Sequence, residues 1–166
     1  RRQRQMCIRD RHLIGHLQVN KVRQAVPMFD LIHSVDSKKL LDEIEKVAAK
    51  HDKVQDILLQ VNVAREASKS GMSVEEFPDI RDYAKTLPHV RVKGLMCMAP
   101  FFENPEDARP IFRVAHALYE DMKGYFPDGD IQYLSMGMTH DFEIALQEGA
   151  NIVRVGTAIF GERVYN

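Results

Sequence analysis

Two turns near the end of the chain carry the residues best suited to chemistry. They read SMGMT at 135–139 and RVGT at 154–157, so each offers a glycine and a hydroxyl after a predicted strand. Such turns can present bare backbone N–H groups and an O–H to an anion at a helix N-terminus, which predicts a phosphate site. The alternative is that Gly137 and Gly156 only permit tight turns. A β-branched side chain at Gly156 is expected to block close backbone approach and to disfavour positive φ.

Four further polar side chains lie within or at the ends of predicted strands. A charged residue within a buried parallel strand usually has a partner or a function, so Arg154 is a candidate binding residue. Asn62 is another, because polar side chains at the carboxyl ends of strands face the mouth of a barrel. His16 and His33 could line the same pocket or could be hydrogen-bonded core residues.

Short apolar runs alternate with segments of helical period, as in repeated strand–helix units around a parallel sheet. The runs that predict strands lie at 13–18, 31–35, 57–63, 90–100, 131–137 and 151–161. An open doubly wound sheet suits this length, whereas a (β/α)₈ barrel typically needs about 250 residues. The first run is not followed by a glycine-rich phosphate turn, whereas the last two are followed by phosphate-like turns, which argues for the barrel.

Several helices are predicted with their caps. Apolar spacing predicts a helix over 38–50, capped by Asp36 or Ser37. Ser73 followed by Glu76 forms a capping box that opens a helix over 74–86. Another helix starts at Asn104, with a buried face of Ile111, Phe112, Ala115, Leu118 and Met122.

The composition of the 166 residues is that of a globular protein, with 45% hydrophobic residues and a net charge of −1. This charge offers no broad attraction to nucleic acid or anionic lipid. No apolar run approaches the roughly 18 residues that span a bilayer. We therefore expect no nucleic-acid partner, no membrane partner and a cytoplasmic location.

The first eleven residues, RRQRQMCIRDR, are strongly basic. We expect residues 1–11 to be a non-native or disordered extension, and residues 12–166 to form one domain. A nucleic-acid arm and part of a transit peptide are the alternatives for the basic stretch.

Five separated motifs together resemble one known family. They are HLIGHLQVNK (12–21), EASKSGM (66–72), GLMCMAP (94–100), SMGMTHDFEIAL (135–146) and VRVGTAIFGER (153–163). In this order and spacing they resemble the pyridoxal 5′-phosphate (PLP) homeostasis proteins, whose barrel is similar to that of alanine racemase. The resemblance implies an α/β fold, namely a partial (β/α)₈ TIM barrel in which the six runs are the third to eighth strands.

The resemblance also implies PLP as the cofactor. The expected cofactor-binding residues are Ser135, Met136, Gly137, Arg154, Gly156, Thr157, Asn62 and His16. By this resemblance the serine, threonine and glycines hold the phosphate, Met136 packs at the cofactor, and Arg154 approaches the pyridine nitrogen. A cation at that nitrogen disfavours its protonation and weakens the ring as an electron sink.

One departure from the family lies at the front of the sequence. In the family, the lysine that forms a Schiff base with PLP precedes the segment that HLIGHLQ resembles. We therefore expect this chain to lack that lysine and to form an incomplete barrel. Lys21 starts a helix after a different strand and is expected to be a surface or capping residue.

These observations favour a non-enzymatic PLP-binding protein of vitamin B6 homeostasis, here a fragment, which makes transient contacts with PLP-dependent enzymes. One alternative is a fragment of a PLP-dependent amino-acid racemase or decarboxylase. Such an enzyme would require a further domain and an acid/base residue on the second face of the cofactor. Another alternative is a phosphate-binding α/β module without PLP chemistry.

Overall fold

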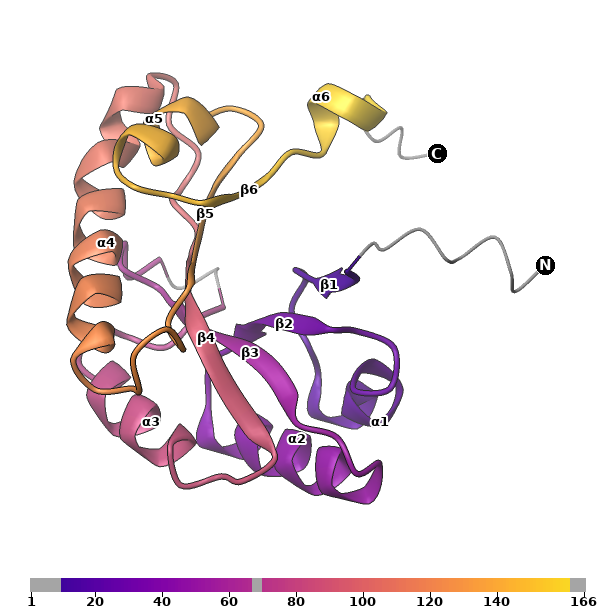
Figure 1. Cartoon of the computed structure of the whole chain (residues 1–166). Coiled ribbons are helices and arrows are strands. Elements are labelled where there is room, and N and C mark those ends of the chain that lie inside the picture. The colour runs from indigo at the N-terminus through magenta and orange to yellow at the C-terminus, as the bar shows by residue number, and fades with distance from the viewer. Residues whose placement is uncertain (1–9, 67–69, 162–166) are drawn as a thin grey trace.

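The strands form one parallel sheet in which neighbouring strands are consecutive in sequence (Figure 1). The structure is a computed structural model that describes residues 10–66 and 70–161. Within these residues the strands are β1 (His12–Leu13), β2 (Leu31–Val35), β3 (Gln55–Val61), β4 (Val90–Cys97), β5 (Tyr133–Met138) and β6 (Ile152–Arg154). A doubly wound sheet would reverse its strand order at a switch point. The sequential order therefore excludes that architecture.

Helices follow the strands, and the longer ones lie along the outer side of the sheet. They are α1 (Val22–Ala25), α2 (Lys38–Lys50), α3 (Phe77–Ala84), α4 (Arg109–Lys123), α5 (Phe142–Gln147) and α6 (Thr157–Phe160), with 3₁₀ segments η2 (Val19–Lys21) and η3 (Pro105–Ala108). Figure 1 shows the sheet curling with α2, α3 and α4 around its convex side. The predicted α/β partial barrel is confirmed.

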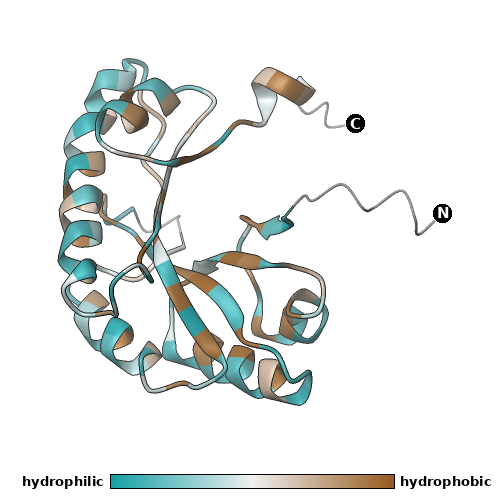
Figure 2. Cartoon of the chain, viewed as in Figure 1, coloured by the Kyte–Doolittle hydropathy of each residue, from teal (hydrophilic) through white to brown (hydrophobic). Residues whose placement is uncertain are grey.

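The main core lies between the sheet and these helices. Ile57 of β3 and Phe112 of α4 belong to it, and both are fully buried. Figure 2 shows hydrophobic residues on the strands and at intervals along α2 and α4. A smaller cluster joins Leu31, Leu58 and Met96 from three neighbouring strands, without any helical residue. Because successive side chains of a strand face opposite sides, this second cluster marks the concave face.

The predicted helix starts are largely confirmed. The Ser37 hydroxyl, rather than Asp36, caps the helix over 38–50 by accepting a backbone N–H at 3.4 Å. The predicted capping box forms, since the Glu76 carboxylate accepts the Ser73 N–H at 3.0 Å. α3 nevertheless begins later than predicted, because its first expected residues form a turn.

The segment that starts at Asn104 begins as a 3₁₀ turn and becomes α4 only at Arg109. The Asn104 side chain accepts the Glu106 N–H at 3.2 Å, as a capping residue does. The buried residues of α4 are Phe112, Ala115, Tyr119 and Met122, whereas Ile111 and Leu118 of the predicted face are only partly buried.

The two edge strands are shorter than predicted. β1 pairs with β2 only through His12 and Leu13, so the predicted strand over 13–18 is mostly irregular chain. β6 ends at Arg154, and the rest of the predicted run over 151–161 forms a turn and α6. An apolar run does not by itself distinguish a strand from the turn that follows it.

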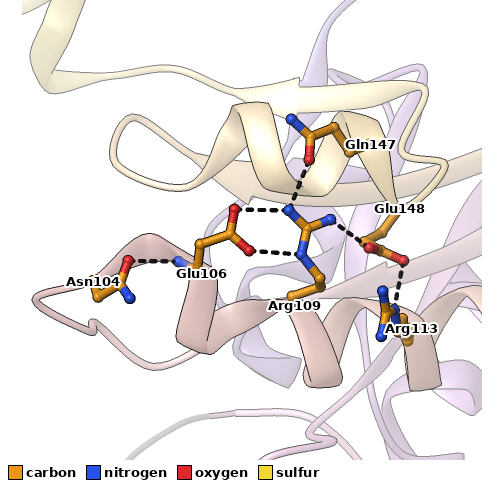
Figure 3. Close-up of polar contacts among 6 residues, drawn as sticks. All are labelled: Asn104, Glu106, Arg109, Arg113, Gln147 and Glu148. Atoms are coloured by element: carbon orange, nitrogen blue, oxygen red, sulfur yellow. Dashed lines mark hydrogen bonds and ion pairs between the residues drawn. The ribbon is translucent and has the colours of Figure 1, made fainter.

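A polar network fixes α5 against α4 (Figure 3). The Arg109 guanidinium bonds both carboxylate oxygens of Glu106, at 2.7 and 2.8 Å, and reaches Glu148 at 2.6 Å and Gln147 at 2.7 Å. Arg113 also donates to Glu148, at 3.1 Å. These contacts hold the pKa of Glu148 below its ordinary value, mainly through the Arg109 hydrogen bond. The network therefore sets the position of the helix that follows the β5 turn.

Of the predicted extension over 1–11, residues 1–9 lie outside the described residues. The Arg11 N–H donates to the Asp30 carboxylate at 2.8 Å, and the Arg11 carbonyl accepts the Asp30 N–H at 2.8 Å. The boundary between residues 11 and 12 stays a prediction. No helix in the described part of the chain is long and apolar enough to span a bilayer.

Candidate functional site

The two predicted turns lie side by side, because β5 and β6 are neighbours in the sheet. The Gly156 N–H donates to the Thr139 hydroxyl oxygen at 3.2 Å and ties one turn to the other. Thr139, Gly156 and Thr157 all line one open cavity of about 1150 Å³. The two turns thus form a continuous wall that offers hydroxyls and backbone at its surface.

The opposite wall of this cavity comes from the other edge of the sheet. His12 of β1 and His33 of β2 line it, and Phe101 from the loop after β4 closes one side. Met138 and Arg154, the last residues of β5 and β6, complete the lining from the carboxyl ends of their strands. In (β/α)₈ barrels ligands bind at this end of the strands.

The two turn glycines serve different purposes. Gly137 has a φ of +90°, and a Cβ atom there would lie 2.6 Å from the Ala145 Cβ and 2.9 Å from the Phe142 Cα. Gly156 has a φ of −116°, and a Cβ atom there would meet nothing within 4 Å. The expected positive φ at Gly156 is therefore wrong. Gly137 is required by packing on α5, whereas Gly156 borders open space that a ligand could enter.

Arg154 is a buried cation at the floor of the cavity. Its side chain donates to the Ser135 hydroxyl at 2.7 Å and to the Cys97 carbonyl at 2.9 Å, while its Nε has no hydrogen-bond partner among the described residues. Burial lowers the pKa of Arg154 from its ordinary value to about 10. The guanidinium therefore stays charged at neutral pH, and its Nε–H is not used by any described residue.

His33 connects this arginine to the far edge of the sheet. Its Nδ1 lies 3.0 Å from the Ser135 Oγ, and its Nε2 lies 3.1 Å from the His12 Nδ1. Burial, the neighbouring His12 and then Arg154 lower the pKa of His33 from 6.5 to about 3. His33 is thus neutral at physiological pH and is a hydrogen-bonding group rather than a proton reservoir.

Comparison with known proteins now decides the family. The profile of the family described as "Alanine racemase, N-terminal domain" matches residues 2–164. The pyridoxal phosphate homeostasis protein of Aquifex aeolicus is 48% identical to the chain over 154 residues, which are 93% of this chain and 67% of that protein. The chain belongs to the pyridoxal phosphate homeostasis protein family. The family member of Pasteurella multocida is 37% identical to the chain, over 93% of this chain and 66% of that protein. The family member of Escherichia coli is 34% identical, over 93% of this chain and 65% of that protein.

The chain thus spans about two thirds of the length of the curated family members that it matches. Among solved structures, PipY of Synechococcus elongatus without PLP aligns with a TM-score of 0.81 at 34% identity, over 90% of this chain and 70% of that chain. PipY with PLP bound aligns with a TM-score of 0.75 at 33% identity, over 90% and 69% of the two chains. An alanine racemase of Clostridium difficile shares the fold at 13% identity, with a TM-score of 0.72 over 98% and 42% of the chains.

The structure places some of the predicted family residues at the cavity and others elsewhere. Arg154, Gly156 and Thr157 line it. Ser135 is fully buried and reaches the site through Arg154. Met136 is fully buried in the core on the helical side of the sheet, and its packing at the cofactor stays a prediction. Adjacent residues of a strand face opposite sides, which explains why Met136 and Ser135 separate.

Two other predicted residues lie away from the cavity. His16 is exposed and lines a separate groove beside η2 and α1, so its role in cofactor binding stays a prediction. The irregular chain after β1 carries it outward. The Asn62 amide donates to the Glu66 carbonyl at 2.8 Å, and its side-chain oxygen accepts the Glu66 N–H at 3.2 Å. Asn62 therefore shapes the loop after β3 and does not line the cavity.

Sequence reasoning missed the contribution of His12, which precedes the first predicted strand run. Its position at the start of the HLIGHLQVNK motif was the available signal. His140, which stacks on Phe101 with ring centroids 4.9 Å apart, was also missed. Neither contact follows from local sequence, because each joins residues at least twenty positions apart.

The buried neutral His33 predicts a pH dependence of stability. Its pKa in the folded chain lies below the unfolded value, so the unfolded chain binds more protons between pH 6.5 and about 3. The stabilisation is present above pH 6.5 and is lost as the pH falls toward 3, by on the order of 5 kcal/mol in full. Urea unfolding at pH 7 and pH 4.5 is expected to show a smaller loss for His33→Asn than for the parent chain. The exposed His51→Asn serves as control, and an unchanged loss in His33→Asn would contradict the prediction.

Proposed function

We propose that this chain forms the phosphate and ring-nitrogen side of a PLP site in a non-catalytic protein of PLP homeostasis. The observation that carries the proposal is a buried arginine on the same cavity as two linked, hydroxyl-bearing turns. The names of the relatives and the structure of PipY with PLP bound support the choice of ligand. The proposal includes a cytoplasmic location and transient contact with PLP-dependent enzymes as acceptors.

The phosphate end fits the turns after β5 and β6. Thr139 and Thr157 carry hydroxyls at the cavity, and Gly156 leaves open space beside its backbone. We assign the phosphate to these residues together with the predicted Gly137. Ser135 lies beneath this wall, and its oxygen already bonds Arg154 and His33. Thr139 and Thr157, which line the cavity, should therefore bind the phosphate in place of the serine.

The ring end fits Arg154. A neutral pyridine nitrogen is an acceptor, and Arg154 carries an Nε–H with no partner among the described residues. PLP supplies an electron sink to amino-acid chemistry when its ring nitrogen is protonated. A permanent cation beside that nitrogen opposes protonation, which suits a binding protein better than a racemase or decarboxylase. His33, neutral and buried, adds no acid/base group at neutral pH.

The test replaces Gly156 with valine. Since the protein leaves open space there and φ is negative, Gly156→Val is expected to keep the melting temperature and to abolish binding of PLP and inorganic phosphate. Calorimetric titration measures both ligands. Gly15→Val is the matched control, because a Cβ atom at Gly15 also meets nothing within 4 Å. Unchanged affinity in a folded Gly156→Val chain would place the site elsewhere.

The same titrations separate the alternatives. Binding of PLP without turnover of amino acids supports the proposal, and turnover would indicate a racemase or decarboxylase. If PLP binds no more tightly than inorganic phosphate, the chain would be a phosphate-binding module without PLP chemistry.

We expect PLP to bind this 166-residue chain reversibly, so borohydride reduction and mass measurement should find no stoichiometric adduct on a single lysine, Lys21 included.

A further inference from the structure

Arg154 is held without an ion-paired carboxylate among the described residues. It is 6% exposed, and none of the ion pairs among the described residues includes it. Two neutral acceptors, the Ser135 hydroxyl and the Cys97 carbonyl, orient its guanidinium. A carbonyl of a central strand is fixed by the sheet, whereas a hydroxyl can rotate about its Cβ–O bond. The orientation of Arg154 therefore depends on what orients Ser135.

Hydrogen-bond chemistry gives a direction to the chain of contacts around Ser135. A guanidinium only donates, so the Ser135 oxygen accepts from Arg154. The hydroxyl proton then points to the His33 Nδ1, 3.0 Å away, which must be an acceptor. The His33 Nε2 carries the single proton of the neutral ring and donates to the His12 Nδ1 at 3.1 Å. In the reverse arrangement the buried Ser135 proton would have no acceptor among its described partners.

The neighbouring elements are consistent with this direction. His33 and Ser135 are each 0% exposed, so water does not compete for their bond. Burial and the neighbouring His12 and Arg154 hold the pKa of His33 far below its ordinary value. Protonation of His33 would remove its acceptor and add a second cation. This series of hydrogen-bonded side chains, His12–His33–Ser135–Arg154, thus crosses from β1 and β2 to β5 and β6 on the concave face.

We propose that His33 is a positioning residue that acts through Ser135 to fix the Arg154 guanidinium for the ring nitrogen of PLP. The inference rests on the proposed function and deepens it, because it separates recognition of the ring from recognition of the phosphate. Ser135 then serves the ring end of the site, although its position in the turn sequence predicted a phosphate ligand. No role in chemistry is assigned to His33 itself.

The experiment compares PLP with its deaza analogue, in which a C–H replaces the ring nitrogen. The parent chain is expected to bind PLP about tenfold more tightly than the analogue, as one hydrogen bond to a charged group provides. His33→Leu and Ser135→Ala should each bring this ratio close to one and leave the affinity for inorganic phosphate unchanged. His33→Asn should restore most of the ratio, since its amide oxygen can accept the Ser135 proton.

Ser34→Ala is the matched control. Ser34 is also a strand serine with 0% exposure, but its hydroxyl has no hydrogen-bond partner among the described residues. It should retain the parental ratio. If His33 had only a structural role, its replacement would weaken the binding of PLP, of the analogue and of phosphate equally, and this result would overturn the inference. An unchanged ratio of the PLP and analogue affinities in His33→Leu and Ser135→Ala would also overturn it.

A measurement without ligand keeps the inference separate from the proposed function. NMR of the ligand-free chain should show slow solvent exchange of the Arg154 Nε–H, faster exchange in Ser135→Ala and His33→Leu, and parental exchange in Ser34→Ala. Equal exchange in all variants would refute the positioning role even if PLP binds. If the parent chain binds neither PLP nor phosphate, the proposed function fails. Faster exchange of the Arg154 Nε–H in Ser135→Ala and His33→Leu would still support the positioning of Arg154 by His33 through Ser135.

Discussion

Gly94→Ala will prevent stable folding of the chain or lower its free energy of unfolding by about 3 kcal/mol or more. Gly94 has a φ of +152°, and a Cβ atom there would lie 1.8 Å from the Tyr133 carbonyl oxygen and 2.7 Å from the Tyr133 carbonyl carbon. Both atoms belong to the backbone of the paired strand β5, so no side chain can rotate away. The register of β3 and β4 also shifts beside Gly94, as at a β-bulge. Circular dichroism and thermal melting measure the effect.

The matched control is Gly15→Ala, since a Cβ atom at Gly15 meets nothing within 4 Å. It should keep the parental melting temperature. A Gly94→Ala chain that melts within a degree or two of the parent would show that β4 and β5 do not approach as described. The loss expected at Gly94 is a large part of the 5–15 kcal/mol that holds a typical domain together.

The 166-residue chain, expressed on its own, is expected to self-associate and to be only marginally stable, so that its unfolding transition is broad. β1 and β6 are the edges of the described sheet, and edge strands can pair with another chain. Large apolar side chains around the cavity are also exposed: Phe160 by 85%, Phe101 by 77%, Ile14 by 47% and Met138 by 44%. Figure 2 shows the brown residues of α6 standing clear of the rest of the fold. Each such side chain that stays exposed loses the stabilisation of about 1.5 to 3 kcal/mol that its full burial would contribute.

Sedimentation velocity measures the association, and urea unfolding followed by near-UV and far-UV circular dichroism measures cooperativity. Extension by two further strand–helix units at the N-terminus is expected to restore one sharp transition. A monomer of the 166-residue chain with coincident, sharp transitions would contradict the prediction and would indicate a self-sufficient sheet.

The sequence by itself determined the units of this fold. The helical spacing of the apolar residues predicted α2 over its whole length, because side chains three and four residues apart lie on the same face of a helix. Alternating strand and helix segments predicted the α/β class, and the motifs predicted the family. The turns over 135–139 and 154–157 were identified because glycine and hydroxyl residues have local conformational and hydrogen-bonding preferences.

Only the tertiary structure decided which of these residues meet. The contact of His33 with Ser135 joins residues 102 positions apart and requires the curl of the sheet. The same sheet sends Met136 to the helical side and Arg154 to the concave side, because each strand's register sets which of its alternate residues face inward. Local sequence also cannot place Gly94 beside the Tyr133 carbonyl, since that approach depends on the pairing of β4 with β5. Register and curvature arise from packing across the whole sheet, so no window of sequence contains them.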